Sequence, residues 1–557
     1  MIYKRLLLSL TFLLMFISAF AQKAEINIAG KVVDSQKEPL AGAVVMLQGT
    51  AKGTMTDEEG NFTITAKKTD VLEVSTLGFV TTYVEVAGKA DHTIVLKEDA
   101  MLIEEAVVEV GYGEQRLVDL TGTVSRVEMD DMIKAPVLSF DQALQGRVAG
   151  LSITSSDGQP GAEMDIVIRG SNSLTQSNSP LYVVDGFPLE DFSASALSQN
   201  DIASITVLKD ASATAIYGSR GANGVIIVET KKGKLGKPAI QYNGNFAMHQ
   251  ASKRMEMMNP YEFVVYQIER SGSNVDKYLT NADRTLEDYL DYNAIDWQDL
   301  LFRNAFVHTH DISMMGGDKK TRYSVSGSVV DQEGVIHNSG YQKYSGRISF
   351  EQHIARGLRF SVNASYLESI ANGQDVASSL SSSSSYASYL MYRTWAYRPV
   401  SLKTLDESDL FDDENNVSST MNPIISNRNE YNKKRTTNLM VNSKLEWEII
   451  DGLKLNVRGG YTRKMIETNQ FNNSYTYKGA PLVNNSLGVN ASHSESNRRE
   501  WMNENTLTYN RQFGKRHKLN AMVGFTISGE NREAYGFTTA QIVNESLGMS
   551  GMDNGIP

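Results

Sequence analysis

The second half of the chain alternates apolar and polar residues with a period of two, the pattern of β-strands that have one apolar and one polar face. From Leu358 to Tyr366 every second residue is apolar, and the residues between them are arginine, serine or asparagine. Similar alternation runs through 453–461, 519–527 and 323–329. Segments of about ten such residues suit tilted strands between lipid and a polar lumen. They also suit a soluble sandwich, and alternation alone does not distinguish the two.

The connections between these segments favour the membrane interpretation. Stretches 355–357 and 451–452 are short, whereas 371–435 is long and polar. Short turns on one side and long loops on the other are typical of outer-membrane barrels. Aromatic residues near predicted strand ends suit an interfacial girdle, although aromatic residues are enriched in strands generally. These residues are Tyr341, Tyr344, Tyr366, Trp447 and Trp501.

The N-terminal quarter reads differently. Residues 1–21 combine Lys4 and Arg5 with an apolar run and the small-residue pattern Ala-Phe-Ala, which predicts a cleavable secretory signal. A membrane anchor needs about 20 apolar residues, and this run is shorter and interrupted. Residues 22–99 then alternate short apolar strands with turn residues, which predicts a small β-sandwich.

Residues 116–234 mix short helices with strands, which predicts a compact α+β domain. Ser139 and Gln142 have the spacing of a capping box at the start of a short helix. The evenly spaced Gly218, Gly221 and Gly224 invite a phosphate-binding interpretation. A phosphate loop places glycines after a strand and before a helix, but here a helical stretch comes first and a strand follows. This order argues against nucleotide binding.

Composition narrows the function. The 557 residues carry a net charge of −11 without a dense lysine and arginine block, so we expect no nucleic-acid partner. Without cysteine the chain has no disulfide, no thiolate nucleophile and no cysteine-based metal site. No arrangement of nucleophile, base and carboxylate supports catalysis. We therefore predict that the protein is not an enzyme and uses no cofactor.

Two clusters of histidine or acidic residues invite a metal-site interpretation. His308 and His310 share one face of a predicted strand, but without a carboxylate partner ordinary histidines are favoured. Acidic residues between Asp406 and Glu414 fit no calcium-loop spacing, so a solvated loop is favoured over a cation site. No metal is therefore predicted.

The sequence of residues 116–234 resembles the plug of TonB-dependent outer-membrane receptors. The resemblance follows Gly158 to Gly161, Ile168 to Gly170, Pro180 to Gly186 and Ile205 to Ile226. Its plug signature consists of Arg169, Gly170, Asp185, Gly186, Lys209, Asp210, Tyr217, Gly218, Arg220, Gly221 and Gly224. Residues 22–99 are similar to a carboxypeptidase-regulatory-like domain, which is not catalytic. Because a domain of this kind precedes the plug, the chain resembles the SusC/RagA branch of these receptors.

This resemblance implies a mainly β protein: a transthyretin-like sandwich, an α+β plug at 116–234 and an incomplete transmembrane antiparallel barrel at 238–557. It favours the barrel over a soluble sandwich for the alternating segments. We count roughly nine candidate strands, whereas plugged transporters of this kind close at about 22. We therefore expect a sequence that lacks the second half of its barrel.

Residues 100–115 taken alone suit a linker or an edge strand. The resemblance implies a TonB box there, and we assign it to Glu105, Ala106, Val107, Val108, Glu109 and Val110. An extended periplasmic segment of this kind would add a strand to the sheet of TonB.

The resemblance also implies function and location. It predicts import of a nutrient across the outer membrane, with TonB, a SusD-like surface lipoprotein and outer-membrane lipid as partners and with the N-terminal domain in the periplasm. The expected cargo is an oligosaccharide. The alternatives are peptide import of the RagA type or, from another class, a surface adhesive or structural β-protein. Nothing in the sequence identifies the ligand-binding residues.

Overall fold

The computed structural model describes residues 25–96, 107–116, 124–129, 137, 139–155, 158–373, 390–401, 421–480, 486–513 and 517–557. Within these ranges it leaves out 35–36, 48–49, 51, 68–69, 77–78, 80, 87–90 and 111–112. The predicted signal at 1–21, the acidic cluster at 406–414 and two residues of the predicted TonB box, Glu105 and Ala106, lie outside the described residues. The chain divides into two compact units, Met1–Val108 with Glu114–Asp119 and Glu109–Gly113 with Leu120–Pro557.

The first unit contains the β-sandwich that the sequence predicts. One sheet has the order β4-β1-β7, and the other has the order β3-β2-β5-β6. Apolar residues at alternate positions fill the core between them, among them Ile28, Val45, Phe62 and Leu72. The strands are β1 (Glu25–Val33), β2 (Val44–Leu47), β3 (Gly53–Met55), β4 (Asn61–Lys67), β5 (Val71–Ser75), β6 (Thr82–Glu85) and β7 (Asp91–Val95).

The plug is built on a mixed five-stranded sheet with the order β10-β15-β16-β13-β14, in which β13 and β16 run parallel. Its strands are β10 (Val124–Glu128), β13 (Leu181–Val184), β14 (Phe187–Leu189), β15 (Ile202–Leu208) and β16 (Val225–Thr230). A separate hairpin pairs β11 (Leu151–Ser155) with β12 (Met164–Ile168). The central strands are buried on both faces, which explains why β13 and the first four residues of β16 are continuously apolar rather than alternating; β15 also buries Ser204 and Thr206.

Short helices cover the plug sheet. They are α2 (Phe140–Leu144), α3 (Ala211–Thr214) and the 3₁₀ segments η3 (Ala194–Ala196), η4 (Gln199–Asp201) and η5 (Ala215–Gly221). The predicted capping box is wrong in detail. Ser139 occupies the N-cap position of α2, but its side chain makes no capping hydrogen bond in this five-residue helix.

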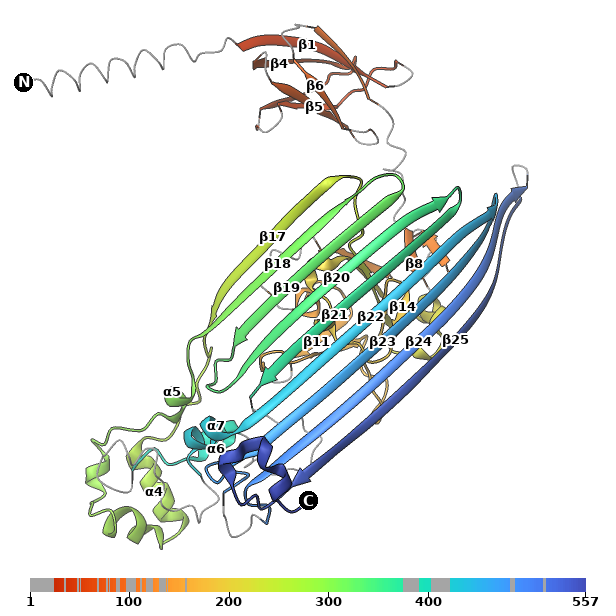
Figure 1. The fold of residues 1–557 in the computed structure, drawn as a ribbon. Coiled ribbons are helices and arrows are strands. Elements are labelled where there is room, and N and C mark those ends of the chain that lie inside the picture. The colour runs from red at the N-terminus through yellow and green to blue at the C-terminus, as the bar shows by residue number, and fades with distance from the viewer. Residues whose placement is uncertain are drawn as a thin grey trace, which may run out of the picture. The chain divides into compact units, whose positions relative to one another are not determined.

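In the described part of the chain, nine antiparallel strands form one wall in sequence order from β17 to β25, which confirms the expected strand count (Figure 1). The strands are β17 (Gly236–His249), β18 (Ala305–Gly317), β19 (Thr321–Glu333), β20 (Gly340–Ala355), β21 (Leu358–Asn372), β22 (Tyr431–Ile450), β23 (Leu453–Asn472), β24 (Asn490–Phe513) and β25 (His517–Thr539). They lengthen from 13 residues in β18 to 24 in β24. This wall agrees with the partial barrel that the resemblance implied for the alternating segments.

The two faces of the wall separate as the alternation predicts. Val362 lies in the same cross-strand row as Phe350 and Ser443, on the face away from the plug. On the opposite face Gly460 packs against the ring of Phe187 in the plug, so closely that a Cβ at 460 would lie 2.1 Å from it. Tyr341 also lies on the plug-facing side and contacts Gly161, so its assignment to an interfacial girdle is wrong.

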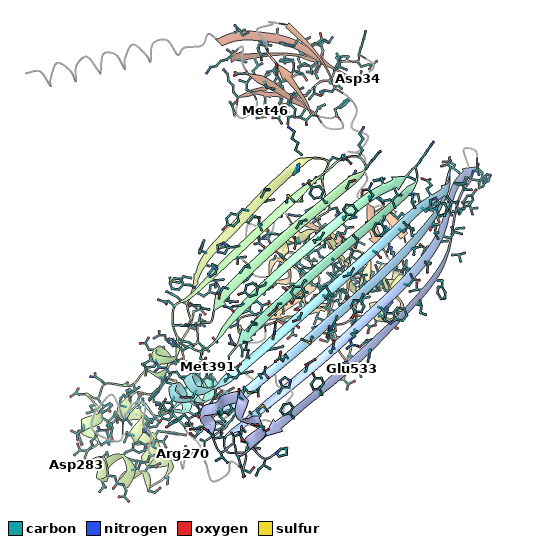
Figure 2. All side chains as sticks on the ribbon, viewed as in Figure 1. Asp34, Met46, Arg270, Asp283, Met391 and Glu533 are labelled. Atoms are coloured by element: carbon teal, nitrogen blue, oxygen red, sulfur yellow. The ribbon has the colours of Figure 1, made fainter. Side chains whose placement is uncertain are left out.

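The connections at the opposite end from the short turns carry helices, namely α4 (Pro260–Arg270), η6 (Asp276–Thr280), η7 (Glu287–Tyr289), α5 (Trp297–Leu301), α6 (Leu390–Ala396), α7 (Pro423–Asn429) and η10 (Glu545–Asn554). Their side chains cluster at this end of the wall (Figure 2). Among the described residues no helix has the length and apolar character to span a membrane.

Candidate functional site

The glycine-rich stretch of the plug is a turn between helical segments and a strand. Gly218 has φ 62° and ψ −145°, a conformation that only glycine adopts at low cost. At Gly221 a Cβ would lie 2.9 Å from the carbonyl oxygen of Thr214. Gly224 has φ +90° and directly precedes β16. The helical segments come first, as the sequence order required, so this stretch lacks the strand-to-helix geometry of a phosphate cradle.

Four signature residues meet at one edge of the plug. Arg169 and Asp210 form an ion pair, and the backbone turns at Arg169 and Gly170 with φ of 57° and 97°. The neighbouring Lys209 donates from Nζ to Ser125 Oγ over 2.6 Å. Loss of hydration and then the charge of Arg169 lower the pKa of Lys209, against the opposing effect of Asp210. These contacts hold the start of α3 against the hairpin β11–β12 and strand β10.

Asp185 and Gly186 form the two-residue turn between β13 and β14. Both have positive φ, 48° and 83°, as a type I′ hairpin turn requires. The Asp185 carboxylate accepts from the backbone N–H of Thr230 over 2.9 Å and from its hydroxyl over 2.6 Å. The turn therefore fixes the end of β16, where the plug meets the wall.

Arg347 of β20 joins this corner to the wall. Its guanidinium donates to the carbonyl oxygen of Lys231 over 2.9 Å and to the hydroxyl of Thr230, and it lies 4.0 Å from the Asp185 carboxylate. The side chains of Arg347 and Asp185 are 3% and 9% exposed. A buried charge of this kind is tolerated only when it is paired and hydrogen-bonded. We call Asp185, Thr230 and Arg347 the plug anchor.

A second polar contact joins the plug to β23 and β24. The Asp191 carboxylate lies 3.3 Å from Lys464 Nζ and 3.2 Å from Arg498 Nη1. Partial burial alone would raise the pKa of Asp191, but the combined charges and hydrogen bonds of Lys464 and Arg498 lower it below its usual value. On the plug side Arg220 lies 3.9 Å from Glu190, which also approaches Arg498. Arg220 thus lies beside this contact.

A third contact is buried and joins a neutral hydroxyl of the plug to a carboxyl group of the wall. Ser198 Oγ donates to Asp311 Oδ1 of β18 over 3.0 Å. Nearby, Asp201 ends η4, and burial is the main cause that raises its pKa above the ordinary value. These three plug-to-wall contacts are polar, so separating them exchanges hydrogen bonds with protein for hydrogen bonds with water, whereas Met440 and Met502 of the wall pack against the apolar core of the plug.

A cavity of about 440 Å³ lies between the plug and strands β20–β23, towards the end of the wall that carries the long connections. Its plug side is the loop 159–163 with Ser193 and Ser195, and its wall side includes Tyr341. The rest of the lining mixes amide and hydroxyl side chains with charged and apolar ones. The amides and hydroxyls are Ser369, Asn372, Asn432, Thr436, Asn438, Thr468 and Gln470, the charged groups are Glu163, Lys434 and Lys464, and Leu367 is apolar. Asn438 Oδ1 is buried and finds no hydrogen-bond partner among the described residues.

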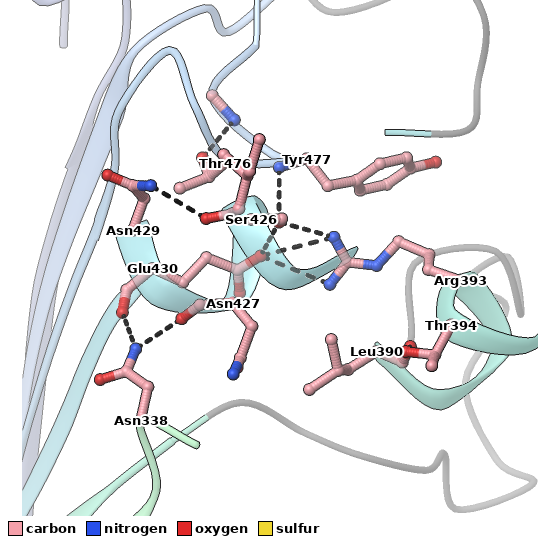
Figure 3. A network of polar contacts seen from close by, with 12 residues as sticks. Asn338, Leu390, Arg393, Thr394, Ser426, Asn427, Asn429, Glu430, Thr476 and Tyr477 are labelled. Atoms are coloured by element: carbon pink, nitrogen blue, oxygen red, sulfur yellow. Dashed lines mark hydrogen bonds and ion pairs between the residues drawn. The ribbon is translucent and has the colours of Figure 1, made fainter. Parts of the chain in front are cut away.

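A buried network ties the helical connections together at this end (Figure 3). Arg393 of α6 donates to Ser426 Oγ of α7 over 2.8 Å and pairs with Glu430 at 3.4 Å. Its guanidinium also lies 4.8 Å from the centre of the Tyr477 ring. Asn338 donates from Nδ2 to the carbonyl oxygen of Glu430 over 2.8 Å. Connections that are distant in sequence therefore form one packed group.

Four of the six predicted TonB-box residues are described. Val107–Val110 forms strand β8 and pairs locally with β9 (Gly113–Arg116) in a two-stranded sheet. The extended conformation that strand addition requires is therefore present. Its role in binding TonB stays a prediction.

The histidine pair lies on the outward face of β18. The rings of His308 and His310 are 5.4 Å apart, and Tyr242 lies 2.7 Å from Nδ1 of His310. Sequence reasoning missed Arg347, Asp191 and Arg498 as plug contacts. The sequence does carry a weak signal for Arg347 and Arg498, because both are charges at lumen-facing positions of strands, but it does not reveal their partners.

Family models and similar proteins agree with this architecture. A model described as the TonB-dependent Receptor Plug Domain matches residues 116–225, and one described as the CarboxypepD_reg-like domain matches 28–108. The chain is 36% identical over 378 residues to the TonB-dependent receptor SusC of Bacteroides thetaiotaomicron, covering 66% of this chain and 36% of SusC. The chain belongs to the SusC/RagA-type TonB-dependent receptors.

Other members of the family extend the match. The TonB-dependent receptor P26 of Formosa agariphila is 32% identical over 544 residues, which cover 95% of this chain and 52% of P26. The RagAB peptide importer in its open-open state superposes with a TM-score of 0.65 at 26% identity, covering 81% of this chain and 52% of that chain. The chain thus spans about half the length of P26 and of a second similar receptor from Formosa agariphila, the TonB-dependent receptor P3.

Membership places the protein in the outer membrane and in a family of transporters rather than enzymes. In barrels of this kind short turns are periplasmic and long loops are extracellular, so we expect the long connections with their helices to be extracellular. The cavity between the plug and β20–β23 lies towards these long connections.

Proposed function

We propose that this chain is part of a receptor that imports a nutrient across the outer membrane, driven by TonB. The observation that supports this most is the nature of the plug contacts. The plug anchor and the Asp191 contact join the plug to the wall, and their polar groups can be rehydrated when the plug is pulled. Mechanical force on the segment 105–110 would be transmitted through the chain to the plug.

TonB binding by Glu105, Ala106, Val107, Val108, Glu109 and Val110 follows from strand addition. Backbone hydrogen bonds supply most of the affinity in this mode, so the sequence requirement is an extended segment without proline. The extended conformation of Val107–Val110 supports the assignment.

The cargo belongs in the extracellular cavity above the plug. Its lining offers many amides and hydroxyls beside Glu163, Lys434 and Lys464, and Asn438 has a buried carbonyl oxygen that the described protein leaves unsatisfied. This chemistry suits a ligand rich in hydrogen-bonding groups, and we propose an oligosaccharide. A peptide backbone is the second candidate, because the solved relative RagAB is a peptide importer.

A surface lipoprotein of the SusD type is the expected partner. The packed extracellular connections around Arg393 and Glu430 offer it a preformed platform. The two-component name of RagAB is consistent with such a partner.

Two substitutions at one position test the TonB mechanism in the receptor expressed in its own outer membrane. Val108→Pro removes a backbone donor and should abolish energy-dependent uptake, whereas Val108→Ala keeps the backbone and should retain most of it. Surface display and passive ligand binding should survive in both variants. Uptake by the proline variant at the level of the parent would refute the transporter mechanism and favour the adhesive alternative.

Supplying labelled oligosaccharides and labelled peptides to the same strains identifies the cargo. Asn438→Ala should weaken binding of the true cargo, while Asn456→Ala, on the same face of the neighbouring strand β23 but nearer the periplasmic end, should not. If only peptides compete, the oligosaccharide proposal is wrong while the import proposal stands.

A further inference from the structure

The outward face of the wall changes character abruptly on β23 and β24. Tyr461 and Trp501 lie directly opposite each other there, and both are partly exposed. The next outward-facing pair towards the extracellular end is Arg463 and Arg499, again directly opposite each other. Tyrosine and tryptophan on a membrane protein mark the level of the lipid headgroups. The two arginines therefore lie at or just above that level, on the side that faces lipid.

Two like charges directly opposite each other destabilise an antiparallel pair. The described residues around Arg463 and Arg499 balance their two positive charges only in part. Arg499 lies 3.5 Å from Glu533 of β25, which is labelled in Figure 2, with both side chains largely exposed. Arg463 donates from Nε to the neutral Asn497 over 3.3 Å. By contrast, the outward-facing Arg435 of β22 has a carboxylate, Glu368, at 2.8 Å.

We infer that Arg463 and Arg499 form a binding site for the phosphate of an outer-leaflet lipid headgroup. A phosphate between them would receive bonds from two planar guanidinium groups and would relieve their repulsion. The adjacent Tyr461 and Trp501 would contact the apolar part of the same lipid. The observations that lead to this site are the register of β23 and β24, the aromatic pair and the charge imbalance. It is separate from the plug, the cavity and the TonB segment.

The test uses the receptor purified in detergent, with the phosphorylated glycolipid lipid A as the probe and lipid A stripped of its phosphates as the comparison. Thermal unfolding and native mass spectrometry report lipid binding. Phosphorylated lipid A should raise the Tm of the parent receptor and should stay bound to it in native mass spectrometry. Lipid A stripped of its phosphates should have a much smaller effect on both measurements. The double variant Arg463→Gln with Arg499→Gln should bind lipid A at least about tenfold more weakly, because charge-assisted bonds are lost.

The matched control is Arg511→Gln, on the same strand and the same outward face but at the periplasmic end, which should bind lipid A as the parent does. Arg463→Lys with Arg499→Lys keeps the charge and should restore part of the binding. Without lipid the glutamine variant should be at least as stable as the parent, since repulsion is removed. Unchanged lipid A binding by the glutamine variant, or equal binding of the two lipid forms by the parent, would overturn the proposal.

Discussion

At the scale of single residues, Arg347 joins the wall to the plug through Thr230, Lys231 and Asp185. Arg347→Met leaves the Asp185 carboxylate buried without its cation, and breaking a buried pair from one side costs about 3–5 kcal/mol. We expect a lower Tm for the receptor and faster proteolysis within the plug. Both are measured on the purified receptor by thermal unfolding and by timed digestion.

Arg359→Met is the matched control for that substitution. Arg359 also lies on the lumen face of the wall, its side chain is 38% exposed, and its described ion pairs are with Glu351 and Glu446 of the wall. An exposed pair contributes about 0–1 kcal/mol, so little change in plug proteolysis is expected. If the two variants behave alike, the plug anchor has no special role.

Gly218 tests the glycine-rich stretch at the same scale. Alanine at φ 62° and ψ −145° is strained, and strain of this type costs about 1–3 kcal/mol. Gly218→Ala should therefore lower Tm, whereas Gly272→Ala should not, because Gly272 has open space around it and no positive φ. Thermal unfolding of both variants measures the difference. Equal Tm values would show that the turn relaxes without cost.

Residue-level prediction from the sequence succeeded where geometry is local. Because a helical stretch precedes the strand, the sequence assigns Gly218 and Gly224 to a turn. The Asp185–Gly186 pair is likewise typical of a hairpin turn. Contacts between plug and wall did not follow from the sequence. Thr230 and Arg347 are 117 residues apart, and nothing in either neighbourhood encodes the partner.

At the scale of elements, the strands of the wall are distinguished by their two faces. Val362→Arg places a charge on the lipid-facing row of β21 and should cost about 2–4 kcal/mol near the midplane. Ser361→Arg is the adjacent control, because it lies on the lumen face in the row of Glu351. Heat-modifiable migration of the folded receptor in membranes measures assembly. Equal yields of the two variants would contradict the assignment of faces.

Elements with strict alternation were predictable because pleat geometry maps sequence parity onto faces. Tyr341 shows the limit of this reasoning. Its place near a strand end suggested a girdle, but its parity puts it on the same face as Lys343 and Arg347, where it contacts Gly161. The Ser139 capping box failed for another reason: with only five residues, α2 depends on packing of Phe140 and Leu144 more than on its cap.

At the scale of the whole molecule, the sandwich and the wall share a hydrophobic period of two, so the resemblance of residues 22–99 and 116–234 to known domains was needed to tell them apart. The placement of the cavity was not predictable, since it lies where the loop 159–163 meets four strands whose register only the folded wall defines. The packing of α6 and α7 through Arg393 was not predictable either, because it also depends on contacts that only the folded chain defines. Long connections show their polarity in the sequence, but not their contacts.

The proposed mechanism requires the plug to move against the wall, and the absence of cysteine from the sequence makes a direct test possible. Ser198 and Asp311 are in side-chain contact across the interface. Ser198→Cys with Asp311→Cys should form a disulfide on oxidation and stop uptake, because the plug is then tied to β18. Reduction should restore uptake to the level of the unoxidised double variant, since a disulfide is reversible by thiol exchange.

Each single-cysteine variant controls for loss of the buried hydrogen bond, and neither should respond to oxidant. Ligand binding at the cell surface should persist in the oxidised double variant, because the cavity and the extracellular connections are untouched. Uptake that continues at the full rate with the disulfide shown to be closed would mean that cargo passes without movement of this part of the plug. The path would then lie away from β18, beside the Asp191 contact with β23 and β24.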